Sequence, residues 1–216
     1  MLTLLLTRHG HTDRSEPEQY LGQHVAAVLT ERGREAAARL AERLADVDID
    51  RIISSPLGRA VETAELICHG CAIEQDARLA ELDYGRWESL TVDEIDRRYP
   101  GERAQYEADP AAHRVGGGES GRHVARRLAP LVEELVEWAE GTGGGRTCML
   151  VGHSSVNRIL LAMCLGVPLS DYRRRFRQDW LNLTVLHWPD RESGPLLLLA
   201  NDQGHVRGLA GSTWEP

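Results

Sequence analysis

The feature that constrains this chain most is an apolar run that breaks abruptly into polar residues. Residues 2–6 are apolar or β-branched throughout, which is typical of a strand buried on both faces of a parallel sheet. Arg8, His9 and Gly10 follow at once. Residues just beyond the carboxyl end of such a strand line the crevice where open α/β sheets bind ligands. The break therefore indicates a ligand site at His9, although three residues taken alone fit an ordinary polar loop better.

Two later strand-like runs also end in polar residues. Residues 51–54 lead into a helix whose first turn carries Arg59, a place where the helix dipole disfavours a cation unless an anion binds there. Residues 146–151 are followed, after one glycine, by His153. Because the carboxyl ends of parallel strands meet at one edge of a sheet, we expect Arg59 and His153 to lie beside His9.

Helix-like segments separate these runs, and the alternation predicts an α/β fold with a parallel sheet. A length of 216 residues fits one domain. The helix-like segments cover residues 30–44, 56–67, 92–99, 119–138 and 156–165, and further strand candidates are residues 72–75, 183–188 and 196–200.

Composition removes several kinds of chemistry. The net charge of −8 and the pI of about 5.6 argue against a nucleic-acid partner. All 25 Lys+Arg residues are arginine, which excludes Schiff-base lysines, Ser-Lys dyads and a Walker-type phosphate lysine. The chain shows neither a basic leader nor a long apolar run, so we expect a cytoplasmic protein without a membrane partner.

Two of the four cysteines have the spacing of a redox or zinc pair. Cys68 and Cys71 form a CxxC sequence, whereas Cys148 and Cys164 lie singly in a strand-like and a helix-like run. A closed zinc site needs four ligands, and no second CxxC follows. We therefore expect reduced thiols without a functional role, with a CxxC redox protein as a remaining alternative.

Together, the strand ends predict a phosphoryl-transfer site without metal, lysine or other cofactor. Arginine forks, a protonated second histidine and helix N-termini can stabilise phosphate oxygens, while a neutral imidazole attacks phosphorus. One carboxyl group among Glu81, Asp83 and Glu88 could supply the acid. His11 has ligand-like spacing to His9, but a partner carboxylate is not evident.

Seven short motifs run in a fixed order along nearly the whole chain. They are Arg8-His9-Gly10-x-Thr12, Leu29-Thr30-Glu31-x-Gly33, Ser54-Ser55-Pro56-Leu57-x-Arg59-Ala60, Glu81 with Gly85-x-Trp87-Glu88, Gly117-Gly118-Glu119-Ser120, Val151-Gly152-His153 and Asn201-Asp202-x-x-His205. In this order they resemble the histidine phosphatase superfamily, the phosphoglycerate mutase-like proteins. One motif is weak evidence, whereas seven in order are specific.

The resemblance implies a single domain over residues 1–216, folded as a three-layer α/β/α sandwich. Its central sheet would be mostly parallel with an antiparallel edge strand, and a helical insert would occupy residues 80–120. The resemblance also implies that His9 becomes phosphorylated and that Glu81 donates a proton to the leaving group and then activates water.

The same resemblance implies the phosphate contacts. Arg8, Arg59 and His153 would hold the phosphoryl group, and Ser154 would offer its backbone N–H. Ser15 stands where the family often has an asparagine that contacts phosphate, and its hydroxyl can still donate.

Within the family, the segment after Glu81 is similar to the broad-specificity and α-ribazole-phosphate phosphatases. The expected function is therefore a metal-independent phosphomonoesterase acting on a small phosphorylated metabolite. A phosphoglycerate-type mutase is the first alternative, and a catalytically weak phospho-ligand or protein-binding module is the second. We expect residues 13–28 and 99–118 to line the leaving-group side, and a homodimer is left open.

Overall fold

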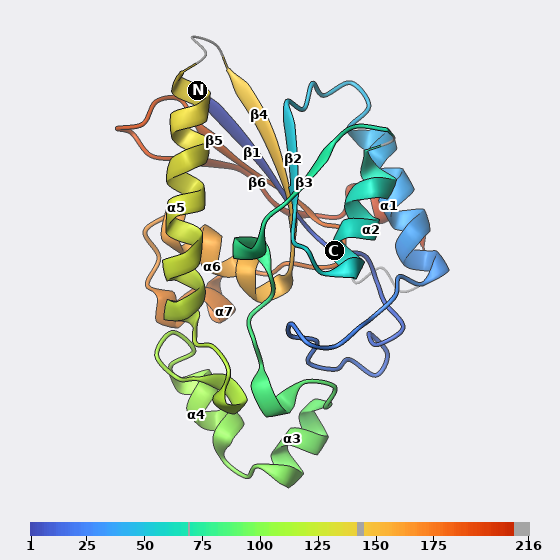
Figure 1. The fold of residues 1–216 in the computed structure, drawn as a ribbon, viewed down its shortest axis with the longest axis vertical. Coiled ribbons are helices and arrows are strands. Elements are labelled where there is room, and N and C mark those ends of the chain that lie inside the picture. The colour runs from blue at the N-terminus through green and yellow to red at the C-terminus, as the bar shows by residue number, and fades with distance from the viewer. Residues whose placement is uncertain (69, 142–144, 210–216) are drawn as a thin grey trace.

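A six-stranded sheet organises the chain in the computed structural model, which describes residues 1–68, 70–141 and 145–209 (Figure 1). The strand order across the sheet is β3-β2-β4-β1-β5-β6. The strands are β1 (Leu2–Arg8), β2 (Arg51–Ser54), β3 (Ile73–Gln75), β4 (Arg146–Gly152), β5 (Leu183–Trp188) and β6 (Leu196–Asp202).

The strand directions confirm the mostly parallel sheet with an antiparallel edge. β1 pairs in parallel with β4, and β2 pairs in parallel with both β4 and β3. β5 runs antiparallel to β1 and forms an antiparallel hairpin with β6, the strand at that edge. The sequence pattern did not predict the order of the strands across the sheet.

Helices cover both faces of the sheet, which gives the expected three layers. In Figure 1, α1 and α2 lie on one side of the strands, and α5 and α6 lie on the other. Thr30 caps α1 as its hydroxyl accepts the Gly33 N–H at 3.2 Å. The helices are α1 (Glu31–Arg43), α2 (Gly58–Ile67), α3 (Val92–Arg98), α4 (Glu102–Ala108), α5 (Gly121–Glu140), α6 (Ser154–Cys164) and α7 (Tyr172–Arg175).

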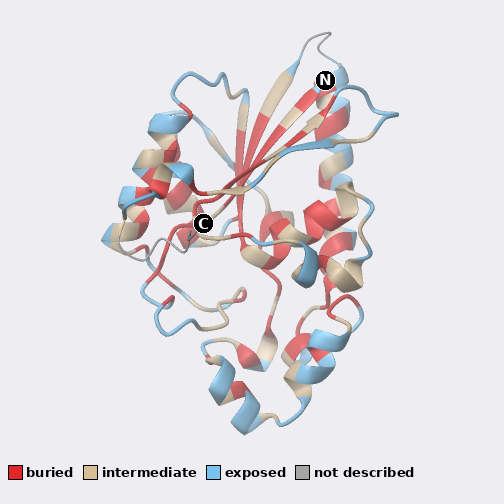
Figure 2. Cartoon of the chain, turned by 180° about the vertical axis from the view of Figure 1, so that it is seen from behind, coloured by how far each residue is buried: buried red, intermediate tan, exposed pale blue. Residues whose placement is uncertain are grey.

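The central strands alternate between two apolar clusters, one on each face of the sheet. On β1, Leu4 and Leu6 join the cluster under α5 and α6, whereas Leu5 joins the cluster under α1 and α2. On β4, Leu150 and Val151 divide in the same way. A strand buried on both faces must be apolar throughout, and Figure 2 shows the buried residues concentrated along these strands.

Residues 80–120 contain α3, α4 and short 3₁₀ turns rather than strands. They lie beyond the carboxyl ends of the parallel strands (Figure 1). Trp87 and Tyr106 anchor this segment, since both are almost fully buried and their rings meet edge to face, with centroids 5.9 Å apart. Trp87 Nε1–H also donates to a Glu102 carboxylate oxygen at 3.1 Å.

The start of α6 differs from the sequence expectation. α6 begins at Ser154, two residues earlier than predicted, because His153 already serves as its N-cap. His153 is therefore held directly at the start of a helix.

No helix in the described ranges is long and apolar enough to cross a membrane.

The two-sided burial of β4 predicts a large difference between two leucines. Leu150 is fully buried, whereas Leu198 on the edge strand β6 is 60% exposed. We expect Leu150→Ala to lower the free energy of unfolding by about 2–5 kcal/mol. Leu198→Ala should change it by less than about 1 kcal/mol. Urea unfolding followed by circular dichroism measures both, and equal losses would contradict this description of the core.

Candidate active site

The parallel register brings three strand ends to one edge of the sheet. Arg8 on β1 lies beside Gly152 on β4, and Ser54 on β2 lies beside Val151. The backbone N–H of His9 donates to the Gly152 carbonyl at 3.0 Å. The residues that follow these strands therefore meet, as predicted from the sequence.

His9 has one ring nitrogen fixed and the other available. The side chain is buried, and Nδ1 lies 2.8 Å from the Gly10 carbonyl oxygen. A carbonyl can only accept a hydrogen bond, so Nδ1 carries the proton and Nε2 carries the lone pair. The His9 and His153 rings lie side by side, with centroids 5.2 Å apart.

The surroundings of His9 favour the neutral ring. Burial lowers its pKa well below 6.5, and the positive charges of Arg59 and Arg8 lower it further. A neutral imidazole with a free Nε2 is the form that can act as a nucleophile.

His153 is fully buried behind His9, and its Nε2 lies 2.8 Å from the Ser55 hydroxyl. Burial, with the charge of Arg59 next, lowers its pKa well below 6.5. These surroundings favour the neutral ring in the ligand-free protein, and protonation of His153 beside a bound phosphate stays a prediction. The dianionic charge of a bound phosphate would oppose this effect.

Arg59 occupies the first turn of α2 and is 2% exposed. Its Nη2 donates to the carbonyls of Leu21 (3.2 Å) and Gly22 (2.9 Å), and Nη1 reaches the Val25 carbonyl at 3.5 Å. Burial, with Arg8 adding to it, lowers its pKa to about 10. The backbone of the loop thus orients a desolvated cation beside His9.

Arg8 extends along the rim of the same pocket. Its Nη1 donates to the Gln178 carbonyl at 3.2 Å, and its guanidinium lies 4.8 Å from the ring centre of Trp180. Among the described residues, the carboxylate that contacts Arg8 is that of Glu18 at 3.5 Å, whose side chain is 67% exposed. Such a solvated contact leaves most of the charge of Arg8 available to a ligand.

Glu81 is held at the N-terminus of α6. Its carboxylate accepts the N–H groups of Leu82 (2.8 Å), Ser155 (3.2 Å) and Val156 (3.3 Å), and the residue is 6% exposed. Of the three candidate carboxylates, Glu81 lines the pocket, whereas Asp83 does not. The helix N-terminus therefore fixes this carboxyl group toward the site.

These side chains surround a pocket of about 280 Å³. The predicted residues Arg8, His9, Ser15, Arg59, Glu81 and Ser154 line it, whereas His153 lies behind His9. The expected loop of residues 13–28 also contributes Arg14, Glu18, Gln19, Tyr20 and Leu21. The sequence did not point to the remaining lining residues, which are Tyr84, Val92, Ser155, Arg158, Arg173 and Trp180.

The contacts of two further side chains that support the site, Thr63 and Tyr84, were not predicted from the sequence. Thr63 Oγ1 accepts the Gly10 N–H at 3.1 Å and donates to the Arg59 carbonyl at 2.6 Å, which ties the first strand end to α2. The Tyr84 hydroxyl lies 2.7 Å from that of Ser155. The position of Thr63, one helical turn after Arg59, was the available signal.

Ser15 uses part of its hydrogen-bonding capacity inside its own loop. Its Oγ accepts the Thr12 N–H at 3.0 Å and lies 3.1 Å from the Thr12 hydroxyl. It still lines the pocket, so its role as a phosphate contact stays a prediction.

The leaving-group side differs in part from the expectation. Residues 13–28 do line the pocket, but residues 99–118 do not. Tyr106 explains this, because it is buried and lies 2.7 Å, hydroxyl to hydroxyl, from Tyr172. That contact packs α4 onto the domain, and Arg158 and Arg173 take the place that the loop was expected to hold.

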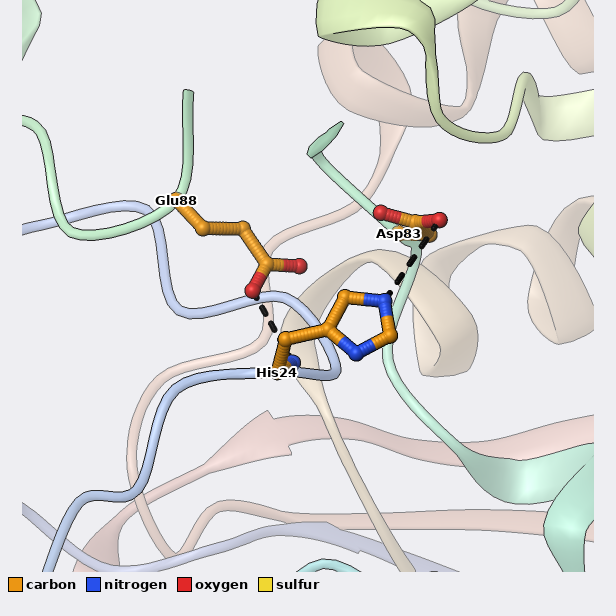
Figure 3. Close-up of side chains that lie close together, drawn as sticks. All are labelled: His24, Asp83 and Glu88. Atoms are coloured by element: carbon orange, nitrogen blue, oxygen red, sulfur yellow. Dashed lines mark hydrogen bonds and ion pairs between the residues drawn. The ribbon is translucent and has the colours of Figure 1, made fainter. Parts of the chain in front are cut away.

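His24, Asp83 and Glu88 bring one ligand atom each within 4.8 Å of one another (Figure 3). Glu88 accepts the backbone N–H groups of Gln23 (2.7 Å) and His24 (2.9 Å), so both its oxygens are in use. The His24 ring is 74% exposed and lies 3.9 Å from Asp83. We interpret these contacts as structural: they hold residues 23–24 of the loop against the segment that carries Asp83 and Glu88.

His11 and the cysteine pair lie outside the pocket lining. His11 Nδ1 lies 3.0 Å from the Thr30 hydroxyl, and Nε2 lies 3.3 Å from Glu16. Cys68 and Cys71 are joined by a disulfide, with Cα atoms 5.8 Å apart, contrary to the expected thiols; the end of α2 brings them within the usual range. His69 between them lies outside the described residues.

The fold and the site together define an α/β protein with a pocket lined by histidine and arginine at the carboxyl ends of its parallel strands. The family model of the histidine phosphatase superfamily (branch 1) matches residues 4–203. The chain belongs to this superfamily.

Relatives and solved structures agree with that assignment. The probable phosphoglycerate mutase GpmB of Salmonella choleraesuis is 34% identical over 211 residues, 95% of each chain. YhfR of Bacillus stearothermophilus superimposes with a TM-score of 0.85 at 31% identity, covering 95% of this chain and 100% of that one. A mycobacterial glucosyl-3-phosphoglycerate phosphatase in complex with inorganic phosphate gives 0.81 at 33% identity, with 93% and 97% covered.

The two neutral histidines predict a pH dependence of stability. The pKa values of His9 and His153 lie below 6.5 in the folded protein, so the unfolded chain binds more protons below that pH. The free energy of unfolding should therefore fall as the pH drops from about 7 to about 5.5, by up to about 1.4 kcal/mol per pH unit for each histidine.

The double variant His9→Asn/His153→Asn isolates this effect, because all other titrating groups remain. Urea unfolding at several pH values should give a shallower slope for the variant than for the wild type. Parallel slopes would show that the two rings bind as many protons in the folded protein as in the unfolded chain, which would contradict their lowered pKa values.

Proposed function

We propose that this protein is a metal-independent phosphomonoesterase that acts on a small phosphorylated metabolite through a phosphohistidine intermediate. The observation that carries the proposal is the state of His9. A neutral ring with its Nδ1 proton fixed by the Gly10 carbonyl directs a free Nε2 lone pair among Arg8, Arg59 and His153.

In the first step, His9 Nε2 attacks phosphorus while the bond from phosphorus to the ester oxygen breaks. Arg8 and Arg59 hold the equatorial oxygens, and a preorganised donor of this kind contributes on the order of 3 kcal/mol to the transition state. Glu81 gives its proton to the departing alkoxide, which leaves as a neutral alcohol.

In the second step, Glu81 is a carboxylate and takes a proton from water as that water attacks the phosphohistidine. The N–P bond breaks, phosphate leaves, and both His9 and the protonated Glu81 return to their starting states. His153 lies against the His9 ring with Nδ1 unpartnered among the described residues, and it serves in this proposal as a further donor to the phosphoryl oxygens.

The N-terminus of α6 adds a further anion contact. Ser154 is the first residue of that helix and lines the pocket, so its N–H belongs to the turn that has no partner within the helix. Ser15 offers a hydroxyl from the opposite loop.

The comparisons favour the phosphatase over the mutase, although each has an observation in its support. The structure solved with inorganic phosphate is that of a glucosyl-3-phosphoglycerate phosphatase, whereas the relatives at 34% identity are named probable phosphoglycerate mutases. An α-ribazole phosphatase of Shigella flexneri, at 24% identity, supports the fold alone. The two activities share the first step and differ in whether water or a second hydroxyl group accepts the phosphoryl group.

His9→Ala should abolish the hydrolysis of 4-nitrophenyl phosphate, with a loss of at least about 1,000-fold, because the covalent route disappears. EDTA should leave the wild-type rate unchanged. Release of 4-nitrophenol, monitored by absorbance, measures both effects.

Retention of activity by His9→Ala, or its loss in EDTA, would contradict the proposal. A mutase would instead move phosphate between hydroxyl groups of a phosphorylated acceptor and release little to water. A protein that binds phosphate without turnover, with or without His9, would be the binding module.

Glu81→Gln keeps the shape of the side chain but removes the proton donor. We expect its rate to fall by about 100-fold or more for alkyl phosphates and by much less for the first step with 4-nitrophenyl phosphate, since a weakly basic leaving group needs no proton. Burst kinetics separate the two steps, and equal losses for both leaving groups in the first step would exclude Glu81 as the acid.

A further inference from the structure

The pocket carries more positive charge than one phosphate group requires. Its lining includes five arginines and two carboxylates, in a chain whose net charge is −8. A phosphate monoester dianion brings about two negative charges, fewer than the three in excess. Arg8 and Arg59 flank His9 and account for the phosphoryl group. The arginines that remain include Arg158 on α6 and Arg173 on α7.

Arg158 has no counter-ion in the part of the chain that the structure describes. Within the described part of the chain it makes neither a hydrogen bond nor an ion pair, and its Nε is buried without a partner. Burial lowers its pKa, and the charges of Arg8 and Arg173 lower it further. A half-buried cation facing two others is costly unless a ligand supplies the missing negative charge.

Arg173 is held in place by aromatic groups rather than by a carboxylate. Its Nη1 donates to the Tyr106 hydroxyl at 3.3 Å, and its guanidinium lies 5.0 Å from the centre of that ring. Tyr106 in turn is buried and lies 2.7 Å from the Tyr172 hydroxyl. These contacts fix the guanidinium while leaving its charge unneutralised.

A second pocket adjoins the first along these residues. It measures about 490 Å³ and shares part of its lining with the pocket around His9. The shared residues are Arg8, Glu18, Arg158, Arg173 and Trp180. In Figure 1, α6 and α7, which carry the two arginines, lie next to each other below the sheet.

The carboxylates of Glu18 and Asp179, which line the second pocket, do not neutralise Arg158 and Arg173. Glu18 is 67% exposed and contacts Arg8 at 3.5 Å, so an incoming anion can displace it. Asp179 lies 2.7 Å from Arg177 and also accepts from Asn201, so it is already engaged.

We propose that Arg158 and Arg173 form a second anion subsite, so that the preferred substrate is a phosphomonoester whose leaving alcohol carries another anionic group. This inference rests on the proposed function and names its substrate class. Arg8, which lines both pockets, places the subsite next to the phosphoryl group and on the leaving-group side. A carboxylate or a second phosphate has the planar or tetrahedral oxygens that guanidinium forks bind.

A matched pair of substrates tests the subsite. 3-Carboxypropyl phosphate and 3-carbamoylpropyl phosphate differ in one charge and share shape and leaving group, and phosphate release gives kcat/KM for each. We expect the wild type to prefer the carboxylate at least tenfold, mainly through KM, as expected for charge-assisted hydrogen bonds. 1,3-Propanediol bisphosphate, compared with 3-hydroxypropyl phosphate, asks the same question of a second phosphate.

Arg158→Met and Arg173→Met should each lower the preference for the charged member of a pair at least tenfold. Arg126→Met, which removes an exposed arginine from α5 outside both pockets, should leave the preference as in the wild type. Rising salt should weaken the wild-type preference, a readout that needs no variant to fold.

A wild-type preference of one or less in both pairs, or a preference that neither variant changes, would overturn the subsite. Preference for either anion supports it and identifies the group. Hydrolysis of 4-nitrophenyl phosphate that depends on His9 would in that case still support the phosphatase, so failure of the subsite is distinct from failure of the proposed function.

Discussion

The parallel pairing of β1 with β4 is the constraint on which the site depends. It sets Arg8 opposite Gly152, so the two residues that follow, His9 and His153, have rings 5.2 Å apart at one sheet edge. A slip of one residue would turn every side chain of the strand to the other face and exchange the two apolar clusters. Because both faces of β1 are buried, the core that stabilises the protein also holds the histidines in register.

The surroundings of these histidines then determine their charge. Both rings are buried beside Arg59, which lowers the pKa of each, so the ligand-free site keeps its positive charge on arginines and its lone pair on His9. Buried cations of this kind reduce stability and persist where function requires them. The positive N-terminus of α6 orients Glu81 in the same arrangement, through the N–H groups of Ser155 and Val156.

Much of the sheet and of the residues that meet in the candidate site could be predicted because the signals are local. Strand ends, a helix-initial Arg59 and a capping Thr30 are each visible within a few residues. The strand order and the hydrogen bonds of Glu81 depend on pairs far apart in sequence, for which one chain offers no signal. Arg173 has no local signal either, since nothing nearby in the sequence shows that Tyr106, some 70 residues away, holds it beside the pocket. The complete burial of His153 could not be predicted for a similar reason, because burial is a tertiary property.

The hydrogen bonds from Arg59 to the carbonyls of residues 21, 22 and 25 have a consequence for how related sequences can diverge. Loops are usually where insertions and deletions accumulate at little cost. The groups that accept hydrogen bonds from Arg59 are main-chain carbonyls. The side chains of the loop can therefore change, whereas the path of its backbone must be kept. A shortened or lengthened loop would misplace a cation at the phosphorus rather than alter the fit of the leaving group. New substrate preferences in this scaffold should therefore arise by exchange of side chains, in the loop and on α6 and α7, rather than by changes in loop length.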